Sequence, residues 1–175
     1  MKERTGKSVD EWVAVVNEHG LDPRDQLAVR NFLKNQHGVL QNSQWAIADA
    51  AARAAGWTPP SIAEYVDNQF SGPKAGLRPI YTALEKLLLA LGDDVSIEGR
   101  SSYLPFIRRR QFAAVAATTR TRVDLGLRFT DPPASGLLAD ARGFAQATHK
   151  IGIASLDDIN DEVRELTRFA YDQNG

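Results

Sequence analysis

Cysteine is absent from this sequence of 175 residues. Its absence excludes a disulfide scaffold, a zinc ribbon, an iron–sulfur site and a thiol nucleophile. No apolar run approaches the roughly 18 residues that a membrane-spanning helix requires. Stretches rich in glycine or proline are short, so they indicate turns and not low-complexity sequence. No apolar segment follows the charged residues 1–7, so the pattern predicts no secretory signal and a cytoplasmic location.

The composition is that of a soluble globular protein. Apolar residues make up 43% and charged residues 25% of the chain, close to the usual values. A chain of 175 residues is long enough for one ordinary domain or two small ones, with a core that needs no metal or disulfide. The composition therefore excludes a disordered or a fibrous protein.

Charge is unevenly distributed along the chain, although the formal net charge is only −1. Residues 95–130 contain seven basic side chains, all arginine, and two acidic ones. Residues 131–175 contain eight acidic and four basic side chains. Since arginine is suited to bidentate contacts with phosphate or carboxylate, two interpretations follow. The arginines pair with the acidic C-terminal block inside the fold, or they form a basic binding face.

The first 56 residues show the pattern of three short helices. These helices are expected over about residues 8–20, 22–38 and 42–56. Ser8 and Glu11 have the spacing of a capping box at the start of the first helix. Asp22-Pro23 is expected to start the second helix, whose apolar side is expected to hold Leu27, Phe32 and Leu33.

Several short motifs in this region are those of a known family. They are Thr5-Gly6-Lys7-Ser8, Glu11-Trp12, Gly20-Leu21, Gln36-His37-Gly38-Val39 and a Gln44 ahead of an alanine-rich helix. Residues 1–56 thereby resemble domain-of-unknown-function family 4287. Thr5-Gly6-Lys7-Ser8 is also similar to the end of a phosphate-binding loop. The glycine and the strand that such a loop requires upstream are absent, which excludes a nucleotide site of that kind.

A domain boundary is predicted at Trp57-Thr58-Pro59-Pro60, which breaks the helical pattern. It divides the chain into a helical module, residues 1–57, and a second domain, residues 61–175. The second domain holds both long apolar helix faces and every predicted strand. We therefore expect it to fold alone.

Within residues 61–175 the period changes from helical to strand-like. Ser61 is placed to start a short helix, and a strong helix with one broad apolar face is expected between Pro79 and Gly92. Further along the chain, alternation with a period of two predicts strands over residues 95–98, 103–107, 112–115, 122–129 and 149–153. A last helix, capped by Ser155, completes the pattern.

The short turns between the first four strands predict an antiparallel meander with one solvent-facing side. The predicted fold class is therefore α+β. It consists of a short N-terminal helical module followed by an antiparallel β-meander flanked by helices that pack on one face of the sheet.

Residues 77–172 contain a second set of family motifs. They are Leu77-Arg78-Pro79-Ile80-Tyr81, Leu91-Gly92-Asp93-Asp94-Val95, Gln111-Phe112-Ala113, residues 119–127, His149, and Asp161-Glu162-Val163 ahead of Ala170-Tyr171. The specific one is Arg122-Val123-Asp124-Leu125-Gly126-Leu127. This region resembles domain-of-unknown-function family 5655, and the resemblance implies no activity. The helix–meander–helix order is similar to the small bacterial proteins of the MmcQ/YjbR type, whose fold is likened to frataxin and for which nucleic-acid binding is proposed.

The strand 122–129 places Asp124 on its polar side together with Arg122, Gly126 and Arg128. One interpretation is a ladder in which the two arginines pair with Asp124. The other is a small-ligand or phosphate site, in which Gly126 allows close approach and the arginines hold an anion, with His149 as a further member. No two of the three histidines have a metal-ligand spacing, and we expect no metal or cofactor.

Arg108-Arg109-Arg110 is expected to form a turn between two strands. Three neighbouring cations in an exposed turn cannot all find partners inside the fold, so at least one is free for phosphate. Replacing all three by alanine is then expected to weaken nucleic-acid binding and to leave folding intact. The affinity of such contacts falls with salt.

The favoured function is that of a cytoplasmic two-module binding or regulatory protein, not an enzyme, that engages nucleic acid or a ribonucleoprotein through an arginine-rich β face. Its binding residues are expected among Arg108, Arg109, Arg110, Arg120, Arg122, Asp124, Arg128 and His149. Candidates for base stacking are Tyr103, Phe106 and Phe112. The alternative is a small-ligand protein or enzyme with an anion site around Asp124. The N-terminal helices are a candidate handle for a protein partner.

Overall fold

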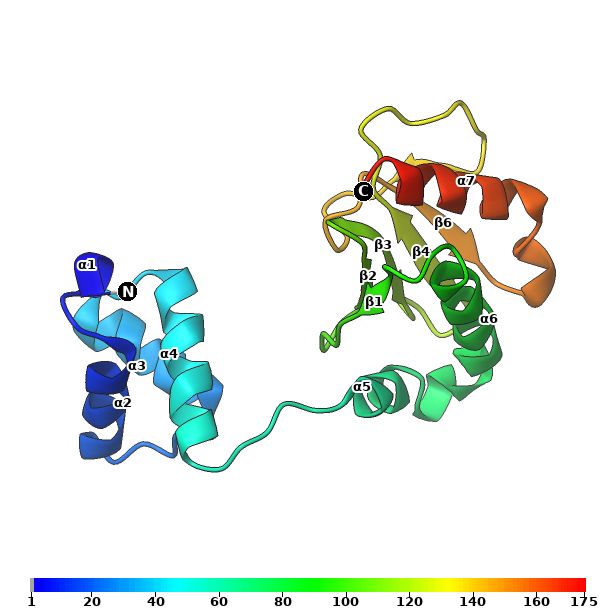
Figure 1. Ribbon diagram of the computed structural model, residues 1–175. Coiled ribbons are helices and arrows are strands. Elements are labelled where there is room, and N and C mark those ends of the chain that lie inside the picture. Colours follow the sequence, from blue (N-terminus) through cyan, green and yellow to red (C-terminus); the bar gives the residue numbers. More distant parts are fainter. Residues whose placement is uncertain (1) are drawn as a thin grey trace. The chain divides into compact units, whose positions relative to one another are not determined.

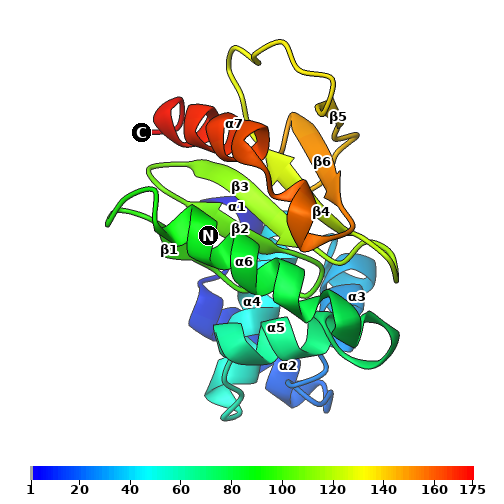
Figure 2. The same ribbon diagram turned by 90° about the vertical axis from the view of Figure 1, so that its right-hand side faces the viewer.

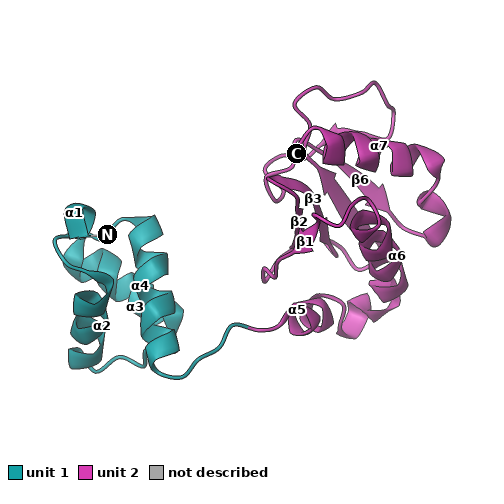
Figure 3. Cartoon of the chain, in the orientation of Figure 1, with its two compact units in different colours: residues 1–59 teal, residues 60–175 magenta. Residues whose placement is uncertain are grey.

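The computed structural model describes residues 2–175. The chain divides into two compact units, Met1–Pro59 and Pro60–Gly175 (Figure 3). The division lies between two adjacent prolines, which have no backbone N–H to donate to a helix. Each unit has its own apolar core.

The first unit consists of helices packed around a small core (Figure 1). Its helices are α1 (Lys2–Thr5), α2 (Val9–Glu18), α3 (Gln26–His37) and α4 (Gln41–Ala54). The buried residues come from α2, α3 and α4 and include Trp12, Val16, Val29, Phe32, Leu33, Ile47, Ala48 and Ala51. The amphipathic spacing seen in the sequence thus brings the apolar sides of these helices together in one core.

The ends of α2 and α3 follow from local capping. The Ser8 hydroxyl accepts the Glu11 N–H at 3.2 Å, and the Glu11 carboxylate accepts the Ser8 N–H at 2.6 Å. This confirms the predicted capping box. The hydrogen bond from the Ser8 backbone N–H, together with the nearby Lys2 charge, lowers the pKa of the Glu11 carboxyl. At the other end, α3 stops at Gly38, whose φ of +61° lies in the left-handed region.

The start of α3 differs from the prediction. The helix begins at Gln26, because the Asp25 carboxylate caps it by accepting the Ala28 N–H at 3.0 Å. Asp22 accepts the N–H of Arg24 instead and stabilises a turn. Leu27, expected in the core, is 60% exposed. Its position two residues before the buried Val29 places it on the opposite side of the helix.

The second unit combines a sheet with helices. Its elements are α5 (Ile62–Gln69), the 3-10 helix η1 (Gly72–Leu77), α6 (Arg78–Leu89), β1 (Ser96–Ile97), β2 (Leu104–Ile107), β3 (Gln111–Ala116), β4 (Val123–Leu127), β5 (Ala139–Asp140), β6 (His149–Ile153), the 3-10 helix η2 (Leu156–Asp158) and α7 (Asp161–Asp172). Each predicted strand is present, and β5 is an additional short one. Across residues 2–175, no helix has both the length and the apolar character needed to cross a membrane.

The six strands form one antiparallel sheet in the order β1-β2-β3-β4-β6-β5 (Figures 1 and 2). The first four strands are a meander, β6 pairs with β4, and β5 pairs with the free edge of β6. With its helical N-terminal part and its separate antiparallel sheet, the chain has the predicted α+β fold class.

One face of the sheet holds the core of the second unit. Leu104, Val115, Leu125 and Ile151 are paired in register across β2, β3, β4 and β6, and all four are buried. The helices α6 and α7 lie over this face (Figure 2) and contribute Leu84, Leu88, Val163 and Leu166. The apolar side chains of the strands therefore point toward the helices, as predicted.

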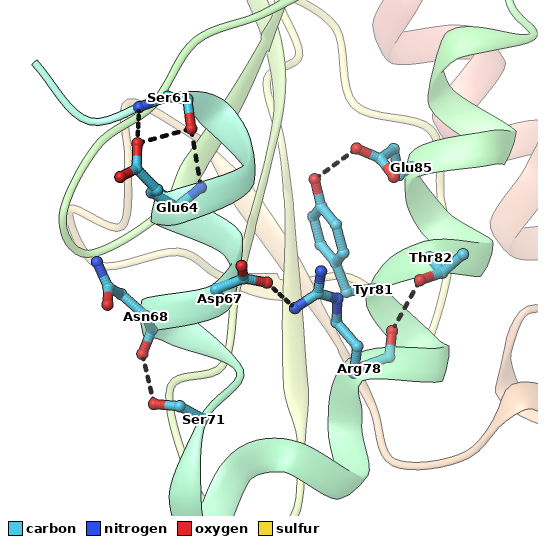
Figure 4. Close-up of polar contacts among 9 residues, drawn as sticks. All are labelled: Ser61, Glu64, Asp67, Asn68, Ser71, Arg78, Tyr81, Thr82 and Glu85. Atoms are coloured by element: carbon cyan, nitrogen blue, oxygen red, sulfur yellow. Dashed lines mark hydrogen bonds and ion pairs between the residues drawn. The ribbon is translucent and has the colours of Figure 1, made fainter.

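Polar contacts fix α5 and its connection to α6 (Figure 4). Ser61 begins α5, as the sequence predicts, and it does so in a capping box with Glu64. At the end of α5, Asp67 Oδ1 lies 2.7 Å from Arg78 Nη1 at the start of α6. Within α6, burial and the neighbouring Glu85 raise the pKa of the Tyr81 hydroxyl.

The sequence predicts that the opposite face of the sheet is exposed to solvent, but this face is covered at β4. All five residues of β4 are buried, including Asp124 and Gly126 on the side that faces away from the helices. The physical reason is a loop that folds over this side.

We predict that residues 60–175 fold without the first unit, because the buried residues of their core cluster all lie between Val66 and Tyr171. The isolated fragment is expected to unfold cooperatively in circular dichroism and to give dispersed amide resonances. A molten fragment with collapsed amide dispersion would instead show that the N-terminal helices complete its core.

Candidate functional site

Small residues line the second face of the sheet. Ala114 lies opposite Gly126, and Ala116 lies opposite Asp124. The loop 141–148 covers this surface: a Cβ atom on Gly126 would lie 2.8 Å from Phe144 Cε1 and 2.9 Å from the Ala147 Cβ. Glycine at position 126 is therefore required by the close approach of this loop, and no room is left there for a ligand.

The covering loop has an unusual backbone. Arg142, Ala145 and Gln146 have φ values of 49°, 50° and 60°, in the left-handed region that disfavours residues with a side chain. The loop is held in place because Gln111, at the start of β3, donates its side-chain amide to the Ala145 carbonyl. Two residues of the loop itself, Ala141 and Ala145, are buried. The second face is thereby closed by fixed contacts.

Asp124 is buried on this face, with 1% of its surface exposed. Its Oδ1 accepts from Arg122 Nε at 2.7 Å, and its Oδ2 lies 3.4 Å from Lys150 Nζ. Gly152 makes room for the first contact, since a Cβ at position 152 would lie 2.5 Å from Arg122 Cδ. One buried carboxylate thus pairs with two cations whose side chains are partly exposed to solvent.

The sequence placed Arg122 correctly beside Asp124, but it missed Lys150. Lys150 belongs to β6, which lies next to β4 although more than twenty residues separate them along the chain. Among the contacts of residues 2–175, Arg128 has no ion pair with Asp124, so the second cation of the expected ladder is Lys150. Alternation along β6 puts Lys150 on the polar side, yet no local signal identifies its neighbouring strand.

His149 does not lie beside Asp124. In the register of the sheet His149 is opposite Leu127, whereas Asp124 is opposite Gly152. The His149 ring contacts the Thr148 hydroxyl at 3.0 Å and packs edge-on against Phe129. The structure therefore separates His149 from the pair Arg122 and Asp124. Within residues 2–175, no three histidine, aspartate or glutamate side chains come together as a metal site.

Arg108 is occupied by the fold. Its Nε lies 2.7 Å from Asp94 Oδ2, its Nη1 donates to the Tyr171 carbonyl at 3.3 Å, and its guanidinium lies 4.1 Å from the centre of the Tyr171 ring. Tyr171 also donates its hydroxyl to Asp94 Oδ1 at 2.7 Å. The two hydrogen bonds, from Arg108 and from Tyr171, lower the pKa of the Asp94 carboxyl. Removing Arg108 would lose these contacts, which argues against the expectation that all three arginines of this turn can be replaced with folding intact.

The other arginines at this end of the sheet differ in their contacts. Arg110 donates from Nη2 to the Gln173 carbonyl at 2.9 Å. Arg109 is exposed and has no ion pair with any residue from 2 to 175. Arg128 is half-buried, and its backbone N–H donates to the Phe112 carbonyl. Gly175 also lies at this end, close to Arg108.

The arginine-rich segment is split between the two ends of the sheet. Successive turns of an antiparallel meander lie at opposite ends, so the six residues of β3 separate Arg108–Arg110 from Arg120 by roughly 20 Å. The turn between β3 and β4 holds Arg120, which is exposed and has no ion pair among the described residues. Lys74 of η1 donates its ammonium group to the Ala117 carbonyl at the start of this turn.

A comparison with known families finds a match for most of the second unit. Residues 66–174 match the model of a domain of unknown function (DUF5655). The chain belongs to the DUF5655 family. The DUF5655 region includes the Asp124 cluster and both arginine turns, and it leaves out the N-terminal helices. No curated protein and no solved structure matches the chain.

We predict that Asp124→Ala lowers the free energy of unfolding by about 1–3 kcal/mol, because Arg122 and Lys150 lose their shared acceptor on a closed face. Urea unfolding at neutral pH measures the change. Asp157→Ala, which removes an exposed carboxylate, is the control and is expected to have an effect within about 0.5 kcal/mol. Equal stabilities of the two variants would contradict a structural role for Asp124.

Proposed function

We propose that this protein is a two-module binding protein whose α+β unit binds the phosphate backbone of nucleic acid, either free or within a ribonucleoprotein. The observation that carries this proposal is the excess of positive charge around the turn between β3 and β4. We also infer a cytoplasmic location, which fits a chain without cysteine.

The charges around this turn do not balance. Arg122 and Lys150 share the single carboxylate of Asp124, and Lys74 donates to the uncharged Ala117 carbonyl. Arg120 adds a cation with no ion pair among residues 2–175. These four cations outnumber the Asp124 carboxylate and the two carboxylates of η2, Asp157 and Asp158, which follow β6 at the same end of the sheet, and the excess favours an anionic partner. Exposed hydroxyls at Thr118, Thr119 and Thr121 offer further donors for phosphate oxygens.

The opposite end of the sheet is less suited to a polyanion. There Arg108 and Arg110 are bound to the C-terminal segment, and Asp94 lies within the same contacts. The carboxylate of Asp172, in the last turn of α7, adds negative charge near Arg108. The acidic C-terminal block thus weakens binding at this end, and the proposal is limited to the turn between β3 and β4.

Binding is expected to show little sequence preference. Phe106 and Phe112 are fully buried, so they cannot stack on a base. Tyr103 is half-buried, and its ring packs against Phe144 at 6.4 Å. Without available aromatic platforms among these three, affinity rests on phosphate contacts and falls with salt.

We predict that the full chain binds labelled single-stranded RNA or DNA weakly at low salt, and that Arg120→Glu lowers the affinity by about tenfold. The salt slope is expected to fall by about 0.7 for each phosphate that the variant no longer neutralises. Arg109→Glu is the matched control, because it changes the net charge equally at an exposed, unpaired arginine on the other end of the sheet.

The control variant separates a local site from a general effect of charge. Equal loss of affinity in both variants would show that net charge alone governs binding. No binding of wild-type protein at low salt would overturn the nucleic-acid proposal and favour the alternative, a protein that binds a small ligand. Circular dichroism verifies that both variants remain folded.

We further propose that the first unit, which resembles domain-of-unknown-function family 4287, docks an acidic amphipathic helix of a partner protein. A groove of about 520 Å³ between α3 and α4 includes three exposed apolar side chains: Leu27, Leu40 and Trp45. The Arg30 guanidinium lies 3.6 Å from the centre of the Trp45 ring and holds it in place. The charged residues that line the groove, Arg30 and Lys34, are both basic, which favours an acidic helix.

We predict that a helical peptide with an apolar stripe and an acidic polar face binds this groove at least about tenfold more tightly than one with a basic polar face. Trp45 fluorescence reports the binding in the wild-type protein. Trp45→Ala lacks this reporter, so it is assayed with a labelled peptide, and it is expected to abolish the binding. Trp57→Phe, at a half-buried tryptophan outside the groove, is the control for the other fluorescent signals. Preference for the basic peptide would contradict the proposal.

A further inference from the structure

A polar pocket lies beside the turn between β3 and β4. Its volume is about 400 Å³, within the range of roughly 300–1,000 Å³ that is typical of small-ligand sites. It is formed by α5, η1, the connection between β1 and β2, and the end of β3. Its lining residues are Asn68, Gln69, Ser71, Pro73, Lys74, Ser101, Ser102, Ala117 and Thr118.

Gln69 presents an unsatisfied acceptor at this pocket. Its Oε1 is buried and, within the described residues, has no hydrogen-bond partner. Its Nε2 donates to the Arg100 carbonyl at 3.3 Å, which fixes the orientation of the amide, because the reverse orientation would place two oxygens against each other. Buried acceptors without a partner are rare in native proteins. A donor that enters the pocket beside Gln69 would satisfy this acceptor.

Lys74 supplies a cation to the same pocket. One of its three N–H donors is used by the Ala117 carbonyl, and two remain. Ser71 donates to the Asn68 carbonyl at 3.1 Å (Figure 4), so its oxygen still accepts, and Ser101 and Ser102 add exposed hydroxyls. The lining residues include neither a carboxylate, which would repel an anion, nor an aromatic ring, which would stack on a base.

We propose that this pocket binds a phosphorylated sugar. The phosphate lies on Lys74, and a sugar hydroxyl donates to Gln69 Oε1 while the serine hydroxyls contact the remaining oxygens. A sugar phosphate supplies both the anion and neutral hydroxyl donors on a separate part of the molecule, whereas inorganic phosphate carries its O–H donors on the phosphate group itself. The inference shares Lys74 with the proposed nucleic-acid surface, and it goes beyond that surface because it depends also on Gln69 and not on Arg120.

Isothermal titration of the full chain with ribose 5-phosphate, ribose and inorganic phosphate tests the proposal. Ribose 5-phosphate is expected to bind about tenfold more tightly than either of the other two. Lys74→Gln is expected to abolish this binding, whereas Lys86→Gln, which removes an exposed lysine on α6, is the matched control and leaves it unchanged. Equal affinities for inorganic phosphate and ribose 5-phosphate would overturn the sugar component.

Gln69→Leu provides a second readout. It removes the unpaired acceptor together with the hydrogen bond from Nε2 to the Arg100 carbonyl, so the melting temperature is expected to change little while the affinity for ribose 5-phosphate falls about tenfold. An unchanged affinity would show that no ligand donor meets this acceptor, and would overturn the proposal.

Two further arms identify the source of the sugar phosphate. A short RNA with a 5′-phosphate that competes with ribose 5-phosphate in wild-type protein, but not in Lys74→Gln, would support a nucleic-acid end as the ligand. Binding of ribose 5-phosphate without such competition would support a free metabolite. The Arg120→Glu variant is expected to retain ribose 5-phosphate binding, so failure of the nucleic-acid proposal and failure of this one give different results.

Discussion

The second unit depends on the burial of β4 on both of its faces. On one face Val123, Leu125 and Leu127 pack under α6 and α7, as the alternation of the strand requires. On the other face Gly126 lets Phe144 and Ala147 approach the backbone, and this contact brings the loop 141–148 over the sheet. A side chain at position 126 would push the loop away and open the surface that contains Asp124. This closure buries Asp124, and the positions of Arg122 and Lys150 follow because both cations pair with its carboxylate.

Because the second face is closed, its charged side chains have a structural role. Asp124 accepts from Arg122 and lies near Lys150, and both cations extend from the covered surface toward solvent. This geometry differs from an open anion site, in which the carboxylate would be absent and the arginines would converge on a hollow. The free cationic surface lies instead at the turn between β3 and β4, where Arg120 is exposed beside Lys74 and the polar pocket.

The C-terminal segment determines what the other arginines can do. Asn174, which is almost fully buried, donates to the carbonyls of Arg128 and Ala170, and its own carbonyl accepts the N–H of Arg110. Together with the Arg108–Asp94–Tyr171 contacts, these bonds join the end of α7 to the turn between β2 and β3. The pairing expected between the arginines and the acidic block is thus largely made with backbone carbonyls at a helix C-terminus, where a cation is favoured by the helix dipole.

The sequence by itself determined the features that depend on near neighbours in the chain. The capping box at Ser8, the start of α5 at Ser61, the end of α3 at Gly38 and the alternation of β4 are set within a few residues, so local spacing predicts them. It also determined the α+β class, because helical and strand-like periods occupy different segments. Only the tertiary structure decided that Lys150 joins Asp124, that Arg109 and Arg120 lie at opposite ends of the sheet, and that Gln69 Oε1 is left without a partner at a pocket. These features arise from strand order, turn geometry and loop closure between residues distant in the chain, and local periodicity carries no information about such pairings.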